Sequence, residues 1–337
     1  MPTTITRLVA NAITSQSVCC SIEPTSPLNG RTSLTYLQPI SRPPISSVAW
    51  VRRAMSSNIG ALGKAGSGPI GGNHPLPIGY RERSAFYDCE FGSFPDEVEF
   101  IASVGQMRGG NVLEVPCACG RLTLPLSRRV ERITAVDRDP KMLLQLQRRL
   151  AARGGIENVK TVLEDMRFLK LSAMFDLIVC PRECFQLLGS ETEALDALSS
   201  FKRHMSKRGC LVLDLATFAR SSEPTEDGPE YFAAGLGDNE LIAEWERGLD
   251  DGSLLRRSRS QRLRSNQLLE LTFFYTLVNG ALTEEFVSTV ELRIYSLCQI
   301  SALLQAAGFR MVEAYGNYRR VPVSENSARL LIVAEAT

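Results

Sequence analysis

Three acidic side chains stand at the ends of strand-like hydrophobic runs. Glu114 lies in NVLEV, Asp137 closes ITAVD, and Asp165 follows VKTVLE, with helix-length segments between the runs. Because parallel strands end at one edge of a sheet, where such folds bind ligands, we expect these carboxylates to be neighbours. The two oxygens of the second carboxylate match the vicinal hydroxyls of a ribose, and the third strand end can accept from an exocyclic amine of a purine. The set predicts a nucleoside-shaped site.

The turn after the first of these strands supplies the other half of that site. It reads Pro-Cys-Ala-Cys-Gly over 116–120 and leads into a helix, so that backbone N–H groups can approach a bound molecule. Cys117 and Cys119 are spaced as small packing residues rather than as a metal or redox pair. If Ala118 has a positive φ, its Cβ costs about 1–2 kcal/mol and crowds the ligand.

The elements that must position these residues alternate in type from Tyr80 onward, as in a parallel sheet wrapped by helices. The expected strands of this part lie at 111–115, 133–137, 159–164, 175–180 and 209–216. The expected helices lie at 140–153, 191–205 and 297–307, with Gly209 as the stop of the second. Two final strands are expected near 310–317 and 328–335.

A different pattern occupies residues 240–295. Asp251-Gly252, Ser265-Asn266 and Asn279-Gly280 are turn signals between alternating flanks, and they predict an antiparallel meander of about four strands. The basic residues from Arg256 to Arg264 are expected to be the solvated face of one strand, opposite acids such as Glu284, Glu285 and Glu291. The alternative is a patch for an acidic substrate or a leader peptide.

Composition excludes several classes of protein. The chain has 337 residues, enough for about two domains, and its 38 basic and 37 acidic side chains offer no global field for nucleic acid or an anionic membrane. No apolar run approaches the roughly 18 residues that span a bilayer. Nine scattered cysteines and two histidines argue against a structural metal site and favour reduced thiols in the cytoplasm.

The first 79 residues differ from the rest in composition. They are rich in Ser, Thr, Pro and Gly and contain a single acid, Glu23. Three interpretations stay open: an organelle transit peptide within 1–54, a disordered tail, or a true start at Met55. We therefore divide the chain into this segment, a core, an inserted region and a return segment, at 1–79, 80–220, 221–296 and 297–337.

Six motifs together resemble the small-molecule branch of the class I S-adenosylmethionine-dependent methyltransferases, and one of them, HMSKRGCLVLDL, matches the turn into their fifth strand. VLEVPCACGR is similar to their glycine-rich motif, AVDRDPKML to the ribose motif, and LEDMRFL to the adenine motif. FDLIVCPRECFQLL resembles their fourth strand with the substrate-side loop, and SAFYDCEFG the helix that covers the cofactor. The resemblance implies a Rossmann-like, doubly wound, mostly parallel seven-stranded sheet with an antiparallel β meander inserted after the fifth strand.

The resemblance also implies a role for each matching residue on the methionine side of the cofactor, S-adenosylmethionine. Glu114 would lie near the amino-acid portion, and the backbone carbonyl of Cys180 near the amino group. Tyr87 would close the site from above. The loop under the methionine would comprise Pro116, Cys117, Gly120 and Arg121, with Ala118 standing where the family has glycine.

On the adenosine side, Asp137 would bind the ribose, and Arg138 and Met142 would border the adenosine. Asp165 would face the adenine amine, while Met166 would offer its backbone N–H and an apolar surface.

The implied activity is methyl transfer to a nitrogen or oxygen of a small molecule or a peptide terminus, of the secondary-metabolite type. Glu183 is the candidate for orienting or deprotonating the acceptor. Other acceptor-side candidates are Gln186, Tyr231, Tyr275 and Tyr295. The inserted meander would wall the acceptor site or form a homodimer surface. Two alternatives remain: an accessory subunit weakened by Ala118, and an NAD(P)-dependent oxidoreductase, although the turn lacks the GxGxxG spacing.

Overall fold

The computed structural model describes residues 76–77, 86–91, 94–217, 236–249 and 251–337, all within the compact unit Ser47–Thr337. The expectations for residues 1–54 and for Tyr231 lie outside the described residues.

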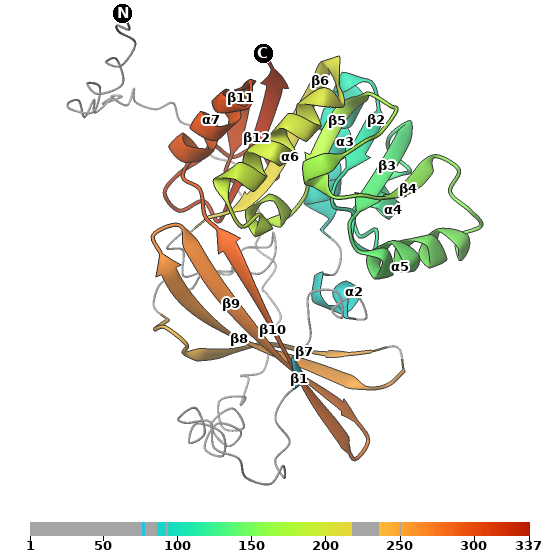
Figure 1. The fold of residues 1–337 in the computed structure, drawn as a ribbon. Helices are drawn as coiled ribbons and strands as arrows, with labels where there is room; N and C mark the ends of the chain where they lie inside the picture. Colours follow the sequence, from blue (N-terminus) through green and yellow to red (C-terminus); the bar gives the residue numbers. More distant parts are fainter. Residues whose placement is uncertain (1–75, 78–85, 92–93, 218–235, 250) are drawn as a thin grey trace, which may run out of the picture. The chain divides into compact units, whose positions relative to one another are not determined.

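A seven-stranded sheet forms the centre of this unit (Figure 1). Its order is β11-β12-β6-β5-β2-β3-β4. The strands β6, β5, β2, β3 and β4 pair in parallel, whereas β12 pairs antiparallel with both β6 and β11. The strands are β2 (Asn111–Glu114), β3 (Arg132–Asp137), β4 (Val159–Leu163), β5 (Phe175–Cys180), β6 (Met205–Ala216), β11 (Phe309–Tyr315) and β12 (Arg329–Ala336). The expected fold class is confirmed.

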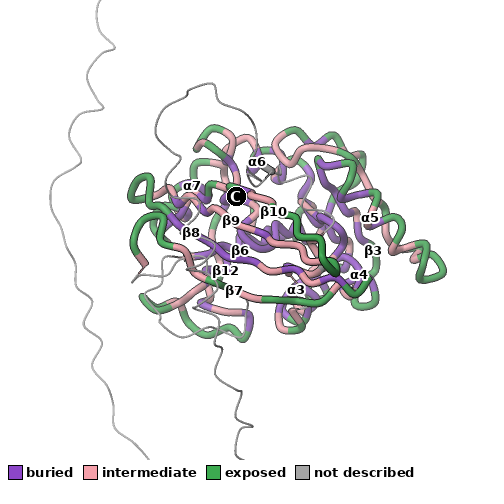
Figure 2. The backbone as a smooth tube through the Cα atoms, turned by 90° about the horizontal axis from the view of Figure 1, so that it is seen from below, coloured by how far each residue is buried: buried purple, intermediate pink, exposed green. Residues whose placement is uncertain are grey.

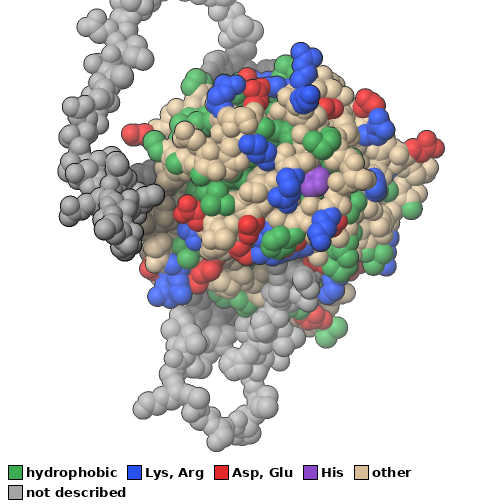
Figure 3. All heavy atoms as spheres, turned by 45° about the horizontal axis from the view of Figure 1, so that its top comes forward, with side chains coloured by type: hydrophobic (Ala, Val, Ile, Leu, Met, Phe, Trp, Pro, Cys, Tyr) green, Lys and Arg blue, Asp and Glu red, His purple; other side chains and the backbone are tan. Residues whose placement is uncertain are grey.

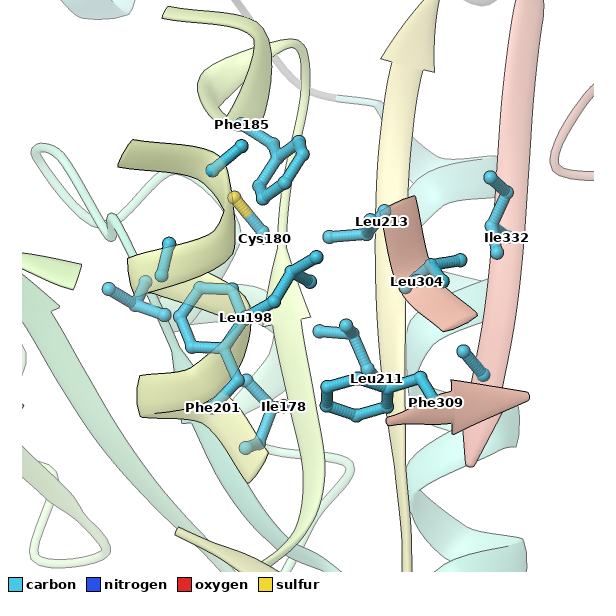
Figure 4. Packing of buried hydrophobic residues seen from close by; sticks show 14 of the residues in the cluster. Ile178, Cys180, Phe185, Leu198, Phe201, Leu211, Leu213, Leu304, Phe309 and Ile332 are labelled. Atoms are coloured by element: carbon cyan, nitrogen blue, oxygen red, sulfur yellow. The ribbon is translucent and has the colours of Figure 1, made fainter. Parts of the chain in front are cut away.

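Helices cover both faces of this sheet, which is the reason its strands are nearly continuous hydrophobic runs. On one face, α6 (Glu191–Arg203) and α7 (Leu297–Ala306) pack on β5, β6 and β12, as Leu198, Leu304 and Ile332 show in Figure 4. The other face packs on α3 (Pro95–Arg108), α4 (Thr123–Leu126) and α5 (Pro140–Ala151). In Figure 2 the buried segments follow mainly the strands of the seven-stranded sheet, and the exposed ones lie at turns, on helix surfaces and along parts of β7 and β10.

Local sequence explains where the site-bearing elements begin. Asp139 caps α5 by accepting from the Lys141 N–H at 2.8 Å, and Pro140 occupies the first helical position. Three-residue and four-residue 3₁₀ turns, η2 (Met166–Phe168) and η3 (Cys184–Leu187), follow β4 and β5. These turns stop each strand at the carboxyl edge of the sheet.

The inserted region forms, together with the short strand β1, a second and mainly antiparallel sheet of order β1-β10-β9-β8-β7. The meander and its turns lie where the sequence predicted them, while the parallel pairing of β1 with β10 was not foreseen. Its strands are β1 (Leu76–Pro77), β7 (Leu241–Gly248), β8 (Leu254–Ser265), β9 (Leu268–Asn279) and β10 (Leu282–Arg293). A short helix, α2 (Tyr87–Phe91), packs on this sheet through Phe86 and Cys89.

Three expectations about local structure were wrong. Gly209 lies inside β6, which begins at Met205, because α6 already ends at Arg203. The helix α3 was not predicted, because its buried positions are hardly more hydrophobic than its exposed positions; Glu97 and Gly105 are among the buried ones. The basic residues of β8 are not one solvated face: Arg257 and Arg259 are buried. Arg262 and Arg264 are exposed as expected, but β8 lies between β7 and β9, away from the acids of β10.

No helix in the described ranges is long and apolar enough to cross a bilayer. On the face seen in Figure 3, basic and acidic side chains are interspersed, in keeping with the balanced composition.

Candidate active site

The turn after β2 is built for close approach of the backbone. Gly120 has φ +83°, and a Cβ there would lie 2.3 Å from Leu146 of α5, so only glycine fits. Ala118 has φ +46°, which confirms the positive φ considered from the sequence and its strain. Pro116 is half-buried, and burial raises the pKa of the Cys117 thiol well above its ordinary value, as expected of a packing residue.

Asp137 ends β3 directly beside this turn. One carboxylate oxygen accepts from the Ala118 N–H at 2.8 Å, and the other accepts from the Asp139 N–H at 2.8 Å. Burial raises the pKa of this carboxyl, and the two backbone N–H groups oppose that shift. Each oxygen retains a second lone pair, so a carboxylate fixed in this way can still accept two hydroxyls.

Glu114 lies at the end of β2, one strand away. It is 1% exposed, and its Oε2 accepts from the Thr123 hydroxyl at 2.7 Å. Burial raises the pKa of Glu114 to about 8, although the Thr123 hydrogen bond and Arg121 act in the opposite direction. The carboxylate of Asp137 is close enough to contribute to that shift, so two of the three carboxylates are neighbours.

Asp165 follows β4, the next strand of the sheet, and is more exposed. It caps η2 and accepts from the backbone and side chain of Arg167, which lowers its pKa. The exposed Arg138 guanidinium lies 3.8 Å from its Oδ2. The next residue in the chain, Met166, is partly buried and packs against the hydrophobic core. All three strand ends thus lie along the same edge, as expected.

Tyr87 of α2 packs on the other side of the turn. It contacts a small cluster of Ala118, Cys119 and Met142, in which the two sulfur atoms lie 3.2 Å apart. Burial raises the pKa of the Tyr87 hydroxyl, while the nearby Arg121 lowers it. The structure therefore packs Tyr87 directly on the turn at Ala118.

Arg121 has a structural partner that the sequence did not reveal. Its guanidinium makes a two-armed ion pair with the buried Glu97 of α3 and lies 5.0 Å from the centre of the Phe94 ring. A second guanidinium, that of Arg182 in the loop after β5, lies 4.2 Å from the centre of the same ring. Phe94 thus joins the cofactor-side turn to the loop after β5.

Five buried side chains form an ion network under the loop after β5, which we call the Asp214 network: Arg182, Glu183, Asp214, Tyr318 and Arg329. Glu183 Oε1 lies 2.7 Å from the Arg329 guanidinium. The backbone N–H groups of Arg182 and Glu183 both donate to Asp214, although both residues have a left-handed backbone. The predicted catalytic Glu183 is therefore held in ion pairs.

The remaining acceptor-side candidates are mostly structural. Gln186 is fully buried and hydrogen-bonds the backbone of Ala216 in β6 and of Arg293 in β10, which ties η3 to both sheets. The Tyr275 hydroxyl donates to Glu90. Tyr295 is 8% exposed, and burial raises its pKa to about 12. Cys180 is fully buried at the end of β5, next to Leu213 of β6.

The residues that sequence reasoning missed share one property: their partners are far away in the chain. Asp214 and Arg329 are 115 positions apart, and Glu90 and Arg257 are 167 apart. No motif spacing marks such pairs. The one available signal was the run of five arginines on β8; β12 has a single arginine, Arg329, at the start of a hydrophobic strand.

Comparisons with known proteins agree with this geometry. Residues 112–209, from β2 to β6, match a family described as a methyltransferase domain. The Bacillus subtilis protein YqeM, whose methyltransferase name is itself provisional, is 21% identical over 227 residues, which cover 67% of this chain and 84% of YqeM.

Solved structures show a likeness in fold over about three quarters of the chain. An S-adenosylmethionine-dependent methyltransferase from Clostridium acetobutylicum has a TM-score of 0.63 at 16% identity and covers 76% of this chain and 98% of its own. CalS10 from Micromonospora echinaspora has a TM-score of 0.58 at 22% identity and covers 78% and 100%. It is an amino pentose methyltransferase of calicheamicin biosynthesis, solved with S-adenosylmethionine bound. At these identities the likeness establishes the fold.

Proposed function

We propose that this chain, which carries a class I S-adenosylmethionine-dependent methyltransferase domain, methylates an amino group of a small polar molecule such as an amino sugar. The observation that carries the proposal is the row of Glu114, Asp137 and Asp165 along one sheet edge, with Tyr87 packed over the turn beside it.

The residues present fit the methyl donor. Asp137 would hold the ribose hydroxyls with its two free lone pairs, and Glu114 would lie toward the charged amino-acid end. Asp165 and Met166 would meet the adenine. The donor itself supplies a methyl group on a sulfonium, and most of the catalysis can then come from aligning the acceptor with that methyl.

An amine acceptor suits the groups on the other side of the site. Glu183 Oε1 lies 2.7 Å from the Arg329 guanidinium, and its Oε2 lies 3.9 Å from that of Arg182, so this carboxylate is engaged within the protein. A neutral amine brings its own lone pair and demands less of a base than a hydroxyl does. We assign Glu183 the role of holding the loop after β5 in place.

Titration calorimetry with S-adenosylhomocysteine tests the cofactor part of this proposal. We expect the unmodified protein to bind, and Asp137→Asn to weaken binding at least about tenfold, because a hydrogen bond to a charged group contributes about 1.5–3 kcal/mol. Asp139→Asn is the matched control, since asparagine caps a helix as well as aspartate does.

Other outcomes would favour the alternatives. Binding of NAD(P) in place of S-adenosylhomocysteine would support an oxidoreductase. Binding of neither, with co-purification of a second protein, would support an accessory subunit weakened by Ala118.

The acceptor is tested with matched pairs of sugars that differ only in carrying an amine or a hydroxyl at one carbon. Methyl transfer confined to the amines is the expected result, and transfer confined to the hydroxyls would reassign the acceptor atom. A role in secondary metabolism, a cytoplasmic location and a homodimer stay predictions, to be tested by pathway context, cell fractionation and gel filtration.

A further inference from the structure

The short helix α2 packs against two different parts of the molecule. Tyr87 and Phe91 lie one helical turn apart with ring centres separated by 4.7 Å, and Tyr87 packs on Ala118, Cys119 and Met142. Phe86 and Cys89 instead pack on the antiparallel sheet. The helix therefore touches the cofactor-side turn with one face and the inserted sheet with the other.

Glu90 fixes the sheet-facing side of α2. It is 3% exposed, and its Oε1 lies 2.8 Å from the Arg257 guanidinium of β8 and accepts from the Tyr275 hydroxyl of β9. A second contact reinforces the first: the Arg247 guanidinium of β7 donates to the Glu90 carbonyl at 3.1 Å. Three successive strands thus hold one turn of helix.

The partners of Glu90 are themselves fixed. Arg257 also pairs with Glu244 at 2.7 Å, and Glu244 pairs with Arg259 at 2.9 Å. The Arg257 guanidinium lies 4.9 Å from the Trp245 ring and 4.8 Å from the Phe273 ring, so apolar walls restrict its motion. Because Arg257 pairs with both Glu90 and Glu244, these buried ion pairs favour one orientation of α2 on the antiparallel sheet.

We infer that Glu90 is a positioning residue for the methyl-donor site: through Arg257 and Tyr275 it holds α2 so that Tyr87 covers the turn at Ala118. The inference rests on the proposed function. It makes the inserted sheet, which the sequence linked only to the acceptor or to dimerisation, part of the cofactor site.

The test is a double-mutant cycle read out as S-adenosylhomocysteine affinity by calorimetry. We expect Glu90→Gln to weaken binding about tenfold, and Tyr87→Ala to weaken it by a similar factor. If Glu90 acts through Tyr87, the double variant binds no more weakly than Tyr87→Ala alone. Additive losses, or an unchanged affinity in Glu90→Gln, would overturn the inference.

Two further variants keep the test decisive if Glu90→Gln folds poorly. Tyr275→Phe removes only the hydroxyl that reaches Glu90 and should weaken binding about threefold, a loss that must vanish in the Tyr87→Ala background. Glu246→Gln breaks the more exposed pair with Arg256 on the same two strands and should leave the affinity unchanged.

The cycle separates this inference from the proposed function. Absence of binding in the unmodified protein would refute the proposed function. Normal binding in both the unmodified protein and Glu90→Gln would refute only the role of Glu90. Thermal unfolding without ligand, measured in parallel, identifies a variant whose only defect is stability.

Discussion

Two buried carboxylates at the same sheet edge have pKa values shifted in opposite directions. Burial raises the pKa of Glu114, whose hydrogen-bond partner is the neutral hydroxyl of Thr123. Burial acts in the same sense on Asp214, but Arg329 and Arg182 outweigh it and lower the pKa. Burial therefore favours the protonated form of the carboxyl at the end of β2, whereas the charge of Asp214 is already neutralised by arginines within the protein.

The difference shows how each half of the site is held. Beside the turn after β2, the backbone N–H groups of Ala118 and Asp139 hold the carboxylate of Asp137. In the Asp214 network, Arg329 of the distant strand β12 pairs with both Asp214 and Glu183. This second arrangement depends on complete ion pairs.

Breaking the Asp214 network should have the largest effect on stability. Arg329→Met leaves Asp214 and Glu183 without their shared guanidinium, and we expect a loss of about 3–5 kcal/mol in the free energy of unfolding. Urea denaturation measures it. Arg310→Met, which removes an exposed pair with Glu335, should cost less than about 1 kcal/mol.

Measuring the affinity of Arg329→Met for S-adenosylhomocysteine separates the role of the Asp214 network in stability from any role in binding. The folded fraction of Arg329→Met should still bind S-adenosylhomocysteine like the unmodified protein, because the turn and Asp137 do not contact Arg329. A loss of stability no greater than in Arg310→Met would show that the network is dispensable.

The same contrast explains what the sequence could predict. Glu114, Asp137 and Asp165 were found because each ends a recognisable strand, and Asp139 because it precedes Pro140 at a helix start. The burial of Arg257 could not be predicted, since it depends on Glu90, which only tertiary packing brings to β8. Glu183 was identified by its position after β5, but its ion pair with Arg329, 146 positions away, could not be predicted from motif spacing.

Glu114 should make stability depend on pH. Its pKa in the folded protein is about 8, against an ordinary value of 4.5, so the folded state holds a proton that the unfolded chain releases. The stabilisation is complete below pH 4.5 and is lost as the pH rises to 8. Relative to Glu114→Gln, the free energy of unfolding should fall by up to about 1.4 kcal/mol per pH unit in that window.

Denaturation of both proteins at several pH values between 4 and 9 checks this, because all other groups titrate equally in the two proteins. Glutamine keeps an acceptor for the Thr123 hydroxyl, so the comparison isolates the charge. A constant difference between the two proteins across the window would mean that Glu114 is ionised in the folded state.

The smallest expected effect concerns Ala118, where the cofactor side departs from a glycine-rich turn. Ala118→Gly removes the strain of a Cβ at φ +46°, worth about 1–2 kcal/mol, but glycine loses about 0.4–1 kcal/mol through the unfolded chain. The net gain in stability should lie between about 0 and 1.6 kcal/mol. S-adenosylhomocysteine should bind severalfold more tightly because the methyl group would no longer stand between backbone and ligand. Gly154→Ala is the converse control: it adds a Cβ at φ +82° in open space and should lower stability without changing affinity. A gain in stability without tighter binding would mean that Ala118 strains the turn but leaves the cofactor uncrowded.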